Sequence, residues 1–220
     1  MNSDPRILEV LLEALRTNRD WFSVESAEGS VLTPVLTTIA SHGLAQRHQK
    51  GFTLRRGARA LLSQFAVRLG ASASKATQHL RPAEFEDFVC SVLQTRDFDA
   101  KRRVLVTTHL GRAQFDVIGI RYHRAIFAEC KKWRRKGALR SVCLVHAEKV
   151  NRFGRAAMKK AFRGIGENVI GFPLVVTLIP DVEFVSNDCL AVGMDKFGRA
   201  VDQIEMGEFD QIGYSWHSAV

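Results

Sequence analysis

The sequence has no apolar run long enough to cross a membrane, and we expect no secretory leader. Its longest apolar stretches, such as residues 174–180, stop well short of the roughly 18–20 residues that a bilayer-spanning helix needs. Residues 1–20 lack the pattern of a signal peptide. Since 46% of the 220 residues are hydrophobic, the chain can fill a core without cross-links. We therefore expect a soluble, cytoplasmic protein with no membrane partner.

Cysteine is scarce, and the cysteines that occur lie far apart in the chain. No two of them form the C-x-x-C pair of a zinc knuckle or a redox dithiol. The four are Cys90, Cys130, Cys143 and Cys189. We expect reduced thiols, most of them buried.

Motifs of several enzyme classes are also missing. There is no G-x-x-x-x-G-K-[ST] loop for a nucleoside triphosphate and no serine nucleophile elbow. His79, His123 and His146 lack the spacing of metal ligands, and such histidines are usually surface residues or hydrogen-bonded core residues. A nucleotide-hydrolysing site and a histidine metal site are therefore not expected.

Positive charge is abundant, and most of it lies in the middle of the chain. Lys and Arg number 32 against 23 Asp and Glu, a formal net charge of +9. Residues 81–166 contain 20 basic and 8 acidic side chains, whereas residues 167–220 contain 2 and 9. Residues 131–136 alone place five cations and a tryptophan in six positions. This density predicts contact with nucleic-acid phosphates.

The first 70 residues predict a small helical domain with a β-hairpin. Helices are expected over 5–15, 21–27, 31–41 (capped by Ser30) and 57–70, and a hairpin over 44–48 and 52–55. The order of helix, short helix, helix, hairpin and helix resembles the winged helix-turn-helix family over residues 5–69. The resemblance implies a DNA-binding wing.

The expected third helix of this domain is almost uncharged. Its polar residues are only Thr, Ser and His, whereas helices that read bases usually carry Arg, Lys, Asn or Gln. The cations lie on and after the wing, at Arg47, Lys50, Arg55, Arg56 and Arg59. We expect the wing to bind duplex DNA without reading its sequence; a module for protein docking or dimerisation is the alternative.

Residues 71–81 are small and polar and end at Pro82, which predicts a linker between a domain over 1–70 and a second over 82–220. In the second domain we expect helices over 84–93 and 141–162 and strands over 103–108, 115–121, 125–131 and 174–179. Residues 188–194 and 199–204 look like a hairpin that extends the sheet, covers its edge or joins a dimer interface. The expected fold is α/β, with helices flanking a mixed central sheet.

Two acids and one lysine on the expected strands could form a hydrolytic site. Side chains alternate along a strand, so Glu129 and Lys131 share a face, and strand pairing can bring Asp116 beside them. Both carboxylates, with the backbone carbonyl of Cys130, suit Mg²⁺ or Mn²⁺ that stays open to a phosphate. The lysine can orient or help deprotonate the attacking water. A structural ion pair is the alternative interpretation.

The spacing of Glu86, Asp116 and Glu129-Cys130-Lys131 resembles the PD-(D/E)xK nuclease superfamily, especially its Mrr-like restriction endonucleases and archaeal Holliday junction resolvases. The stretches EFEDFVCSVLQTRDFDAKRR and FDVIGIRYHRAIFAECKKW carry the similarity, which covers residues 82–179. It implies a restriction-endonuclease-like fold, two metal-ligating acids, Lys131 as the catalytic lysine and Glu86 as a helix acid. Glu84 is the alternative for that last role.

Basic residues near this motif are expected to bind DNA phosphates, although a solvated basic face is the alternative. They are Lys132, Arg134, Arg135, Lys136, Lys149, Arg152 and Arg155.

Two functions agree with these features. The first is a nucleoid-associated, metal-dependent DNA endonuclease, either structure-specific in repair or recombination or Mrr-like in restriction. It would act as a homodimer or with a DNA-processing partner. The second is a DNA-binding regulator or repair-complex subunit whose nuclease core is degenerate. Junction, flap and restriction substrates all stay open at this point.

Overall fold

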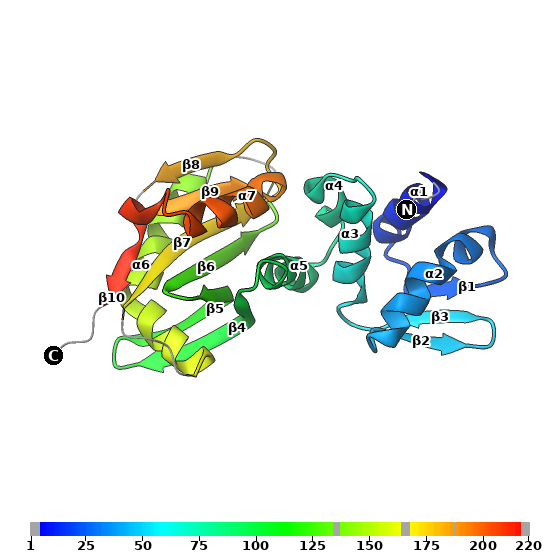
Figure 1. The fold of residues 1–220 in the computed structure, drawn as a ribbon, viewed down its shortest axis with the longest axis horizontal. Helices are drawn as coiled ribbons and strands as arrows, with labels where there is room; N and C mark the ends of the chain where they lie inside the picture. Colours follow the sequence, from blue (N-terminus) through cyan, green and yellow to red (C-terminus); the bar gives the residue numbers. More distant parts are fainter. Residues whose placement is uncertain (1–4, 134–136, 164–167, 187, 217–220) are drawn as a thin grey trace. The chain divides into compact units, whose positions relative to one another are not determined.

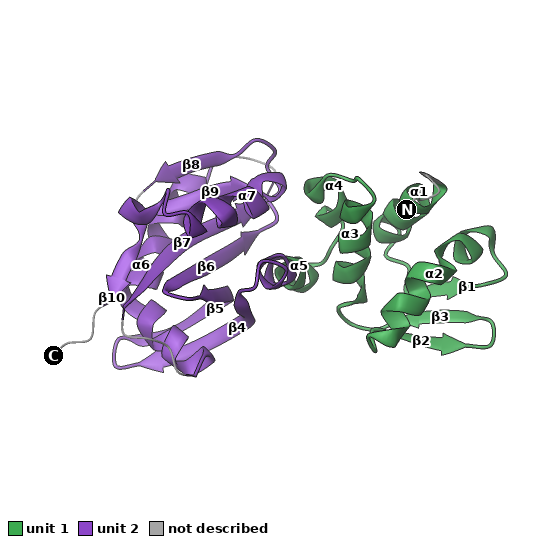
Figure 2. Ribbon diagram, in the orientation of Figure 1, with its two compact units in different colours: residues 1–88 green, residues 89–220 purple. Residues whose placement is uncertain are grey.

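The computed structural model describes residues 5–133, 137–163, 168–186 and 188–216. The chain divides into two units, Met1–Phe88 and Val89–Val220, and the division falls inside helix α5 (Pro82–Gln94) (Figure 2). No helix among the described residues is both long and apolar enough to cross a bilayer.

The first unit combines helices with a three-stranded antiparallel sheet of order β1-β3-β2 (Figure 1). Its elements before α5 are α1 (Pro5–Arg16), β1 (Trp21–Ser23), α2 (Ala27–Ser41), β2 (Ala45–His48), β3 (Gly51–Leu54), α3 (Ala58–Arg68) and α4 (Ala73–Thr77). The expected hairpin is present as β2 and β3, in which Ala45 pairs with Leu54 and His48 with Gly51. Fully buried leucines of α1 and α2, including Leu11 and Leu36, fill the core of this unit.

The structure differs from the sequence-based prediction at the start of this unit. Residues 21–23 form strand β1 rather than a short helix, and Phe22 pairs with Phe52 of β3. Both phenylalanines are buried, so burial in a sheet decides the conformation. Helix α2 begins earlier than expected because Ser26, not Ser30, caps it, accepting a hydrogen bond from the Gly29 amide at 3.0 Å. The unit therefore has one helix fewer before the hairpin than expected.

The expected linker, residues 71–81, belongs to the first unit and contains helix α4. Ser63 of α3 donates from its hydroxyl to the Ala76 carbonyl at 2.9 Å, and Ala76 and Thr77 are fully buried. The small side chains that suggested flexibility instead allow α4 to pack closely against α3.

The second unit contains a seven-stranded mixed sheet of order β4-β5-β6-β7-β9-β8, with β10 paired to β7. Its elements are β4 (Asp99–Thr108), β5 (Gly111–Arg121), β6 (Arg124–Lys131), α6 (Leu139–Ala161), β7 (Val169–Thr177), β8 (Glu183–Ser186), β9 (Cys189–Gly193), α7 (Met194–Glu205), the 3-10 turn Asp210–Ile212 and β10 (Tyr214–Trp216). Strands β4, β5 and β6 form an antiparallel meander, and β6, β7 and β9 run parallel. This arrangement confirms the expected α/β class, with helices flanking a mixed central sheet.

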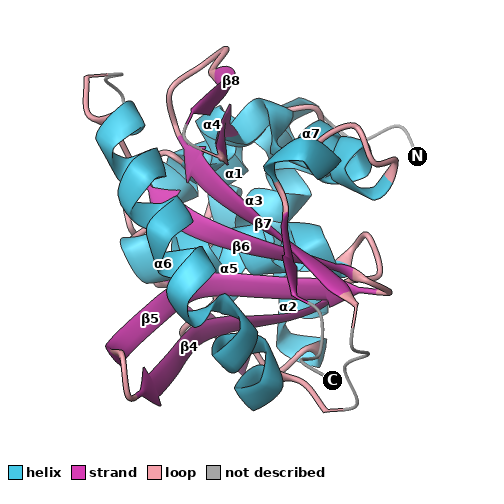
Figure 3. Cartoon of the chain, turned by 90° about the vertical axis from the view of Figure 1, so that its left-hand side faces the viewer, coloured by secondary structure: helices cyan, strands magenta, loops and turns pink. Residues whose placement is uncertain are grey.

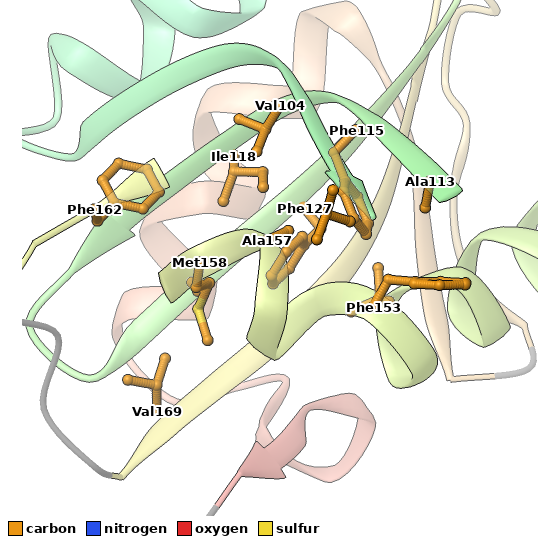
Figure 4. Close-up of a cluster of buried hydrophobic side chains, with 13 residues drawn as sticks. Val104, Ala113, Phe115, Ile118, Phe127, Phe153, Ala157, Met158, Phe162 and Val169 are labelled. Carbon is orange, nitrogen blue, oxygen red and sulfur yellow. The ribbon is translucent and has the colours of Figure 1, made fainter. Parts of the chain in front are cut away.

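Helices α6 and α7 lie on opposite faces of this sheet (Figures 1 and 3). Helix α6 is the crossover from β6 to β7. Its apolar residues, such as Val150 and Ala157, pack against Phe115 of β5 and Phe127 of β6 in one buried cluster (Figure 4). The two phenylalanine rings lie 5.2 Å apart between centroids. This cluster fixes α6 over β5 and β6.

Residues 199–204 belong to helix α7 and not to a hairpin as expected. The buried residues of α7 recur at helical spacing: Met194, Phe197, Ala200, Val201 and Ile204. The prediction over 188–194 was better, because residues 189–193 form β9. Strand β7 begins at Val169, five residues before the expected start.

Candidate functional site

The structure brings together three of the residues expected to act in hydrolysis. Lys131 Nζ lies 2.8 Å from Glu129 Oε1 at the end of β6. Asp116 on β5 contacts the same segment of β6. The backbone amide of Cys130, the residue between Glu129 and Lys131, donates to Asp116 Oδ2 at 2.8 Å. Asp116, Glu129 and Lys131 are all partly buried. The arrangement agrees with the spacing argument made from the sequence.

A break in strand alternation places Asp116. Ala113 and Phe115 pack on the α6 side of the sheet, and so do Ile118 and Ile120, so the alternation shifts by one residue at positions 116–117. The β4–β5 ladder omits the pair between Arg102↔Val117 and Val104↔Phe115, which is where Asp116 lies.

The residue at the matching position of β4 is strained. Arg103 has a φ of 54°, a left-handed conformation that costs energy for any residue with a side chain. On the β6 side of β5, the backbone pairing of the two strands ends at Val117↔Ala128. Beyond it, the Cys130 amide of β6 donates to the Asp116 carboxylate in place of a backbone carbonyl. A local irregularity in two strands thus directs one carboxylate toward β6.

Both carboxylate oxygens of Glu129 are bound by ammonium groups. Lys131 contacts Oε1, and Lys149 of α6 lies 2.6 Å from Oε2. The side chain of Glu129 is only 14% exposed. Burial alone would raise the pKa of Glu129, but the charge of Lys149 and the hydrogen bonds from both lysines lower it to about 2. Glu129 is therefore ionised at neutral pH.

Lys131 keeps its proton because its acidic neighbours outweigh the effect of burial. Burial opposes the charge on its ammonium, but the hydrogen bond and charge of Glu129, together with the charge of Asp116, raise the pKa of Lys131 above its usual value. The ammonium also lies 5.9 Å from the ring centre of Trp133. The Trp133 carbonyl in turn accepts a hydrogen bond from Thr177 of β7 at 3.0 Å. Lys131 is thus a fixed, charged hydrogen-bond donor.

His146 of α6 is completely buried beside Glu129. Its Nε2 lies 2.8 Å from the Phe127 carbonyl, and because a carbonyl only accepts, Nε2 carries the proton. Nδ1 has no hydrogen-bond partner among the described residues and lies 3.6 Å from Glu129 Oε2. Burial and the nearby Lys149 lower the pKa of His146 to about 4. The ring is neutral at physiological pH.

A cavity of about 220 Å³ opens at this cluster. It is lined by Glu129, Lys131, Ser141, Val142, Val145, His146 and Lys149. Oxygen donors from Asp116, Glu129 and the Cys130 carbonyl have the chemistry that Mg²⁺ or Mn²⁺ requires. A cation bound to Glu129 would displace Lys131 or Lys149 from a carboxylate oxygen. Within the described ranges there is no cluster of three or more His, Cys, Asp and Glu side chains that could hold a metal alone, so water or phosphate oxygens would complete the coordination.

The two candidates for the helix acid have different surroundings. Glu84 is buried in the first unit, where it accepts a hydrogen bond from the Arg81 amide at 2.7 Å and faces Arg59 at 3.7 Å. It caps α5 and balances a buried charge, which is a structural role. Glu86 is partly buried on α5 in the same unit, and its contribution to catalysis stays a prediction.

The expected DNA-binding residues of the second unit lie mostly around α6. Lys149 contacts Glu129, as described above, and also donates to the Gln114 carbonyl at 3.1 Å. Arg152 is exposed, and Arg155 and Lys132 are partly buried. Arg134, Arg135 and Lys136 lie outside the described residues.

The wing cations Arg47, Lys50, Arg55 and Arg56 are all exposed, as phosphate contact would require. Arg59 differs from the expectation, because it is only 2% exposed. It donates to the Leu15 carbonyl and pairs with Glu84. Its position on the inner side of α3 makes it part of the core instead of the DNA-binding surface.

Sequence reasoning missed that His146 and Lys149 both face Glu129. Their i, i+3 spacing puts them close together on one side of α6, but the sequence alone does not reveal that this side meets the end of β6. The apolar residues Cys143, Ala147 and Val150, all buried in α6, are the signal from which the inward face could have been found. The two residues lie at the margin of that face.

Comparison with known proteins yields structural similarity only. No protein-family model matches the chain, and no curated protein matches it. The chain is similar to protein VC1899 from Vibrio cholerae, with 16% identity, a TM-score of 0.35 and coverage of 94% of this chain and 51% of that one. It is also similar to Can2 from Sulfobacillus thermosulfidooxidans, solved with cyclic tetra-adenylate, with 11% identity, a TM-score of 0.40 and coverage of 93% and 51%. The chain spans about half the length of these two structures.

Proposed function

We propose that this protein is a metal-dependent DNA endonuclease whose active site is formed by Asp116, Glu129 and Lys131. One observation carries the proposal: Asp116, in the middle of β5, accepts a hydrogen bond from the amide between Glu129 and Lys131, which form an ion pair near the end of β6 and line a cavity. The strand irregularity at Asp116 supports it, since strained backbone gathers at functional sites. Association with the nucleoid and action in repair, recombination or restriction belong to the same proposal.

Asp116, Glu129 and the Cys130 carbonyl would hold Mg²⁺ or Mn²⁺, which supplies charge neutralisation and a bound water of lowered pKa. Lys131 remains protonated, so it donates a hydrogen bond from Nζ and offsets the negative charge that develops on the phosphate. Its raised pKa favours this role over that of a general base. In the reaction, an oxygen–phosphorus bond forms from water while the bond to the leaving sugar oxygen breaks.

The test is cleavage of supercoiled, branched, flapped and linear DNA in the presence of Mg²⁺ or Mn²⁺, with and without methylation. We expect cleavage by the unchanged protein and a loss of at least about a hundredfold in Asp116→Asn and Lys131→Met, because each removes charge that acts on the transition state.

Matched controls separate chemistry from general charge effects. Asp99→Asn changes an exposed acid on β4, and Lys160→Met removes an exposed lysine on α6; neither residue lines the cavity at Glu129. Both controls should retain cleavage. If Asp116→Asn or Lys131→Met cleaves as fast as these controls, the active-site assignment is wrong.

One observation favours a second function, that of a non-catalytic DNA-binding regulator or repair-complex subunit. Two ammonium groups already satisfy Glu129, so the cluster is electrostatically complete without a cation. Titration calorimetry with Mn²⁺ distinguishes the two functions. Undetectable cation binding, together with strong, salt-dependent duplex binding, would support the second.

A further inference from the structure

A groove of about 540 Å³ lies next to the candidate active site and is distinct from its cavity. It is lined by Thr108, His109, Leu110, Arg152, Arg155, Ala156 and Lys159. One wall is the tip of the β4–β5 hairpin, and the other is the second half of α6. Three of the seven lining residues are cations and none is acidic, so the groove favours an anionic ligand.

The groove continues the face of α6 that borders the active site. Val145 and Lys149 line the first cavity, and Arg152, Ala156 and Lys159 line the groove. Steps of three and four residues keep a single face of a helix. The active-site cavity and the basic groove are therefore successive parts of one surface along α6.

Helix geometry gives the length of this surface. At about 1.5 Å per residue, Arg152 lies about 4.5 Å and Lys159 about 15 Å along the axis from Lys149. A strand of B-form DNA advances about 3.4 Å per nucleotide, so the distance from Lys149 to Lys159 corresponds to about four nucleotides. Lys149 contacts Glu129 directly, which places the scissile phosphate at that end.

We infer that the groove binds the backbone phosphates of the DNA strand being cut, on one side of the scissile bond only, over about four nucleotides. This inference rests on the proposed function and deepens it. It assigns a phosphate-binding role to Lys159 and His109, and it makes the substrate requirement asymmetric.

The ion pair that Arg152 makes on α6 is weak enough for a phosphate to replace it. Arg152 pairs with Glu148 at 3.4 Å, but the two side chains are 48% and 63% exposed, and such surface pairs hold little energy. A phosphate can replace Glu148 as the partner of Arg152. The hairpin wall is ordered by a hydrogen bond from the Leu110 amide to the Thr108 hydroxyl at 3.1 Å. His109 and Leu110 are exposed at the tip, beside the path of the strand.

Binding without catalysis tests the groove first. Fluorescence anisotropy with labelled duplex DNA, with EDTA present to prevent cleavage, should show at least about tenfold weaker binding for Arg152→Glu/Lys159→Glu. The slope of log affinity against log salt should fall by about two, one for each lost phosphate contact. Lys160→Glu is the control, because Lys160 is exposed in the same turn of α6 but does not line the groove.

The variant Glu148→Gln gives a change in the opposite direction. Removal of the acid frees Arg152 and should tighten DNA binding slightly, by about twofold. If Lys160→Glu weakens binding as much as the double variant does, the effect is one of net charge and the groove is not a specific phosphate track.

Substrate length tests the asymmetry. After the cleavage position is mapped, duplexes are shortened stepwise from either end, and cleavage should fall sharply on one side once fewer than about four nucleotides remain. In Arg152→Glu/Lys159→Glu this one-sided requirement should disappear. Equal sensitivity on both sides would overturn the inference while leaving the nuclease proposal intact. Absence of any cleavage, with normal behaviour in the binding assay, would overturn the nuclease proposal alone.

Discussion

At the scale of single residues, the candidate site is a balance between burial and charge. Glu129 and His146 occupy the same partly enclosed space, yet their pKa values move for different reasons. Two lysines overcome the effect of burial on Glu129, whereas burial dominates for His146. The result at neutral pH is one full negative charge beside one neutral ring.

The neutral state of His146 predicts a pH dependence of stability. Its pKa is about 4 in the folded protein and about 6.5 in the unfolded chain. Protons therefore bind the unfolded state more tightly, and a stabilisation present above pH 6.5 is lost as the pH falls to 4. The expected loss is about 3 kcal/mol. Denaturant unfolding of the cation-free protein between pH 7 and 4 measures it.

The variant His146→Gln is the control for this effect, since glutamine can donate to the Phe127 carbonyl but does not titrate. Its stability should change little over the same interval. Glu129, whose pKa falls from 4.5 to about 2 on folding, begins to lose its contribution near pH 4.5 and loses most of it below pH 4. A wild-type profile that is flat from pH 7 to 4 would contradict the assignment of a buried neutral His146.

Arg59 and Glu84 predict strong coupling in the first unit. Burial lowers the pKa of Arg59, and the charge of Glu84 opposes that shift. Glu84→Gln leaves a buried guanidinium with less compensation, so we expect a loss of about 3–5 kcal/mol. Arg59→Met/Glu84→Gln removes both charges and should be clearly more stable than the single variant. Denaturant unfolding of both variants and of Arg59→Met completes the cycle, and additive effects would contradict the coupling.

At the scale of elements, the short strand β10 pairs with β7 and is anchored by the aromatic side chain of Trp216. The Trp216 ring packs edge-on against Phe127, with 5.8 Å between centroids. It occupies space left by two glycines. A Cβ added at Gly154 of α6 would lie 2.9 Å from the ring, and one added at Gly171 of β7 would lie 2.0 Å from it. The glycines are needed here for space and not for backbone freedom.

Gly171→Ala should therefore release β10 from the sheet. The added methyl group cannot fit beside the indole, and overpacking of this kind costs about 1–3 kcal/mol. We expect faster hydrogen exchange at the amides of Tyr214–Trp216 and little change in β4. Gly137→Ala is the control, because nothing lies within 4 Å of its added Cβ. Unchanged protection of β10 in Gly171→Ala would contradict this packing.

Elements were predictable from the sequence where periodicity and burial agree. The three strands β4 to β6 and the helix α6 were expected near their observed positions because apolar residues recur at the spacing of each structure. Residues 199–204 were mistaken for a strand because Gly198 suggested a turn. In the structure, the missing side chain of Gly198 leaves room for Arg96, whose Nη2 would lie 2.4 Å from an added Cβ. The helical spacing of Phe197, Val201 and Ile204 was the sequence signal that should have outweighed this glycine.

The candidate site was predictable in part for the same reason. The Glu129–Lys131 spacing follows from strand alternation, so their contact could be expected. The position of Asp116 depends on a break in that alternation, and the approach of Lys149 and His146 depends on where α6 crosses the sheet. Neither feature has a local sequence signal.

At the scale of the whole molecule, the acidic C-terminal residues neutralise basic residues from the middle of the chain. Asp202 pairs with Arg96 at 2.8 Å, Glu205 pairs with Arg121, and Asp210 pairs with Arg124. Asp202 and Glu205 belong to α7, on the sheet face opposite α6. The separation of charge seen along the sequence is therefore partly cancelled in space. On the α6 side, Arg152 of the groove instead pairs with Glu148 of its own helix.

This distribution predicts that DNA binding responds to charge changes on one face of the second unit only. Asp202→Asn/Glu205→Gln/Asp210→Asn raises the formal net charge from +9 to +12 and removes an acidic partner from each of three arginines. If net charge governed binding, affinity would rise and the salt slope would increase by up to about three. We expect instead a change of less than about threefold, because freed cations that do not touch phosphates release no counterions. Stability should fall by about 0.6–3 kcal/mol, at about 0.2–1 kcal/mol for each of the three surface pairs. Anisotropy titrations over a range of salt, beside those of Arg152→Glu/Lys159→Glu, make the comparison. A large gain in affinity in the triple variant would place DNA on the α7 face as well and would contradict binding along α6 alone.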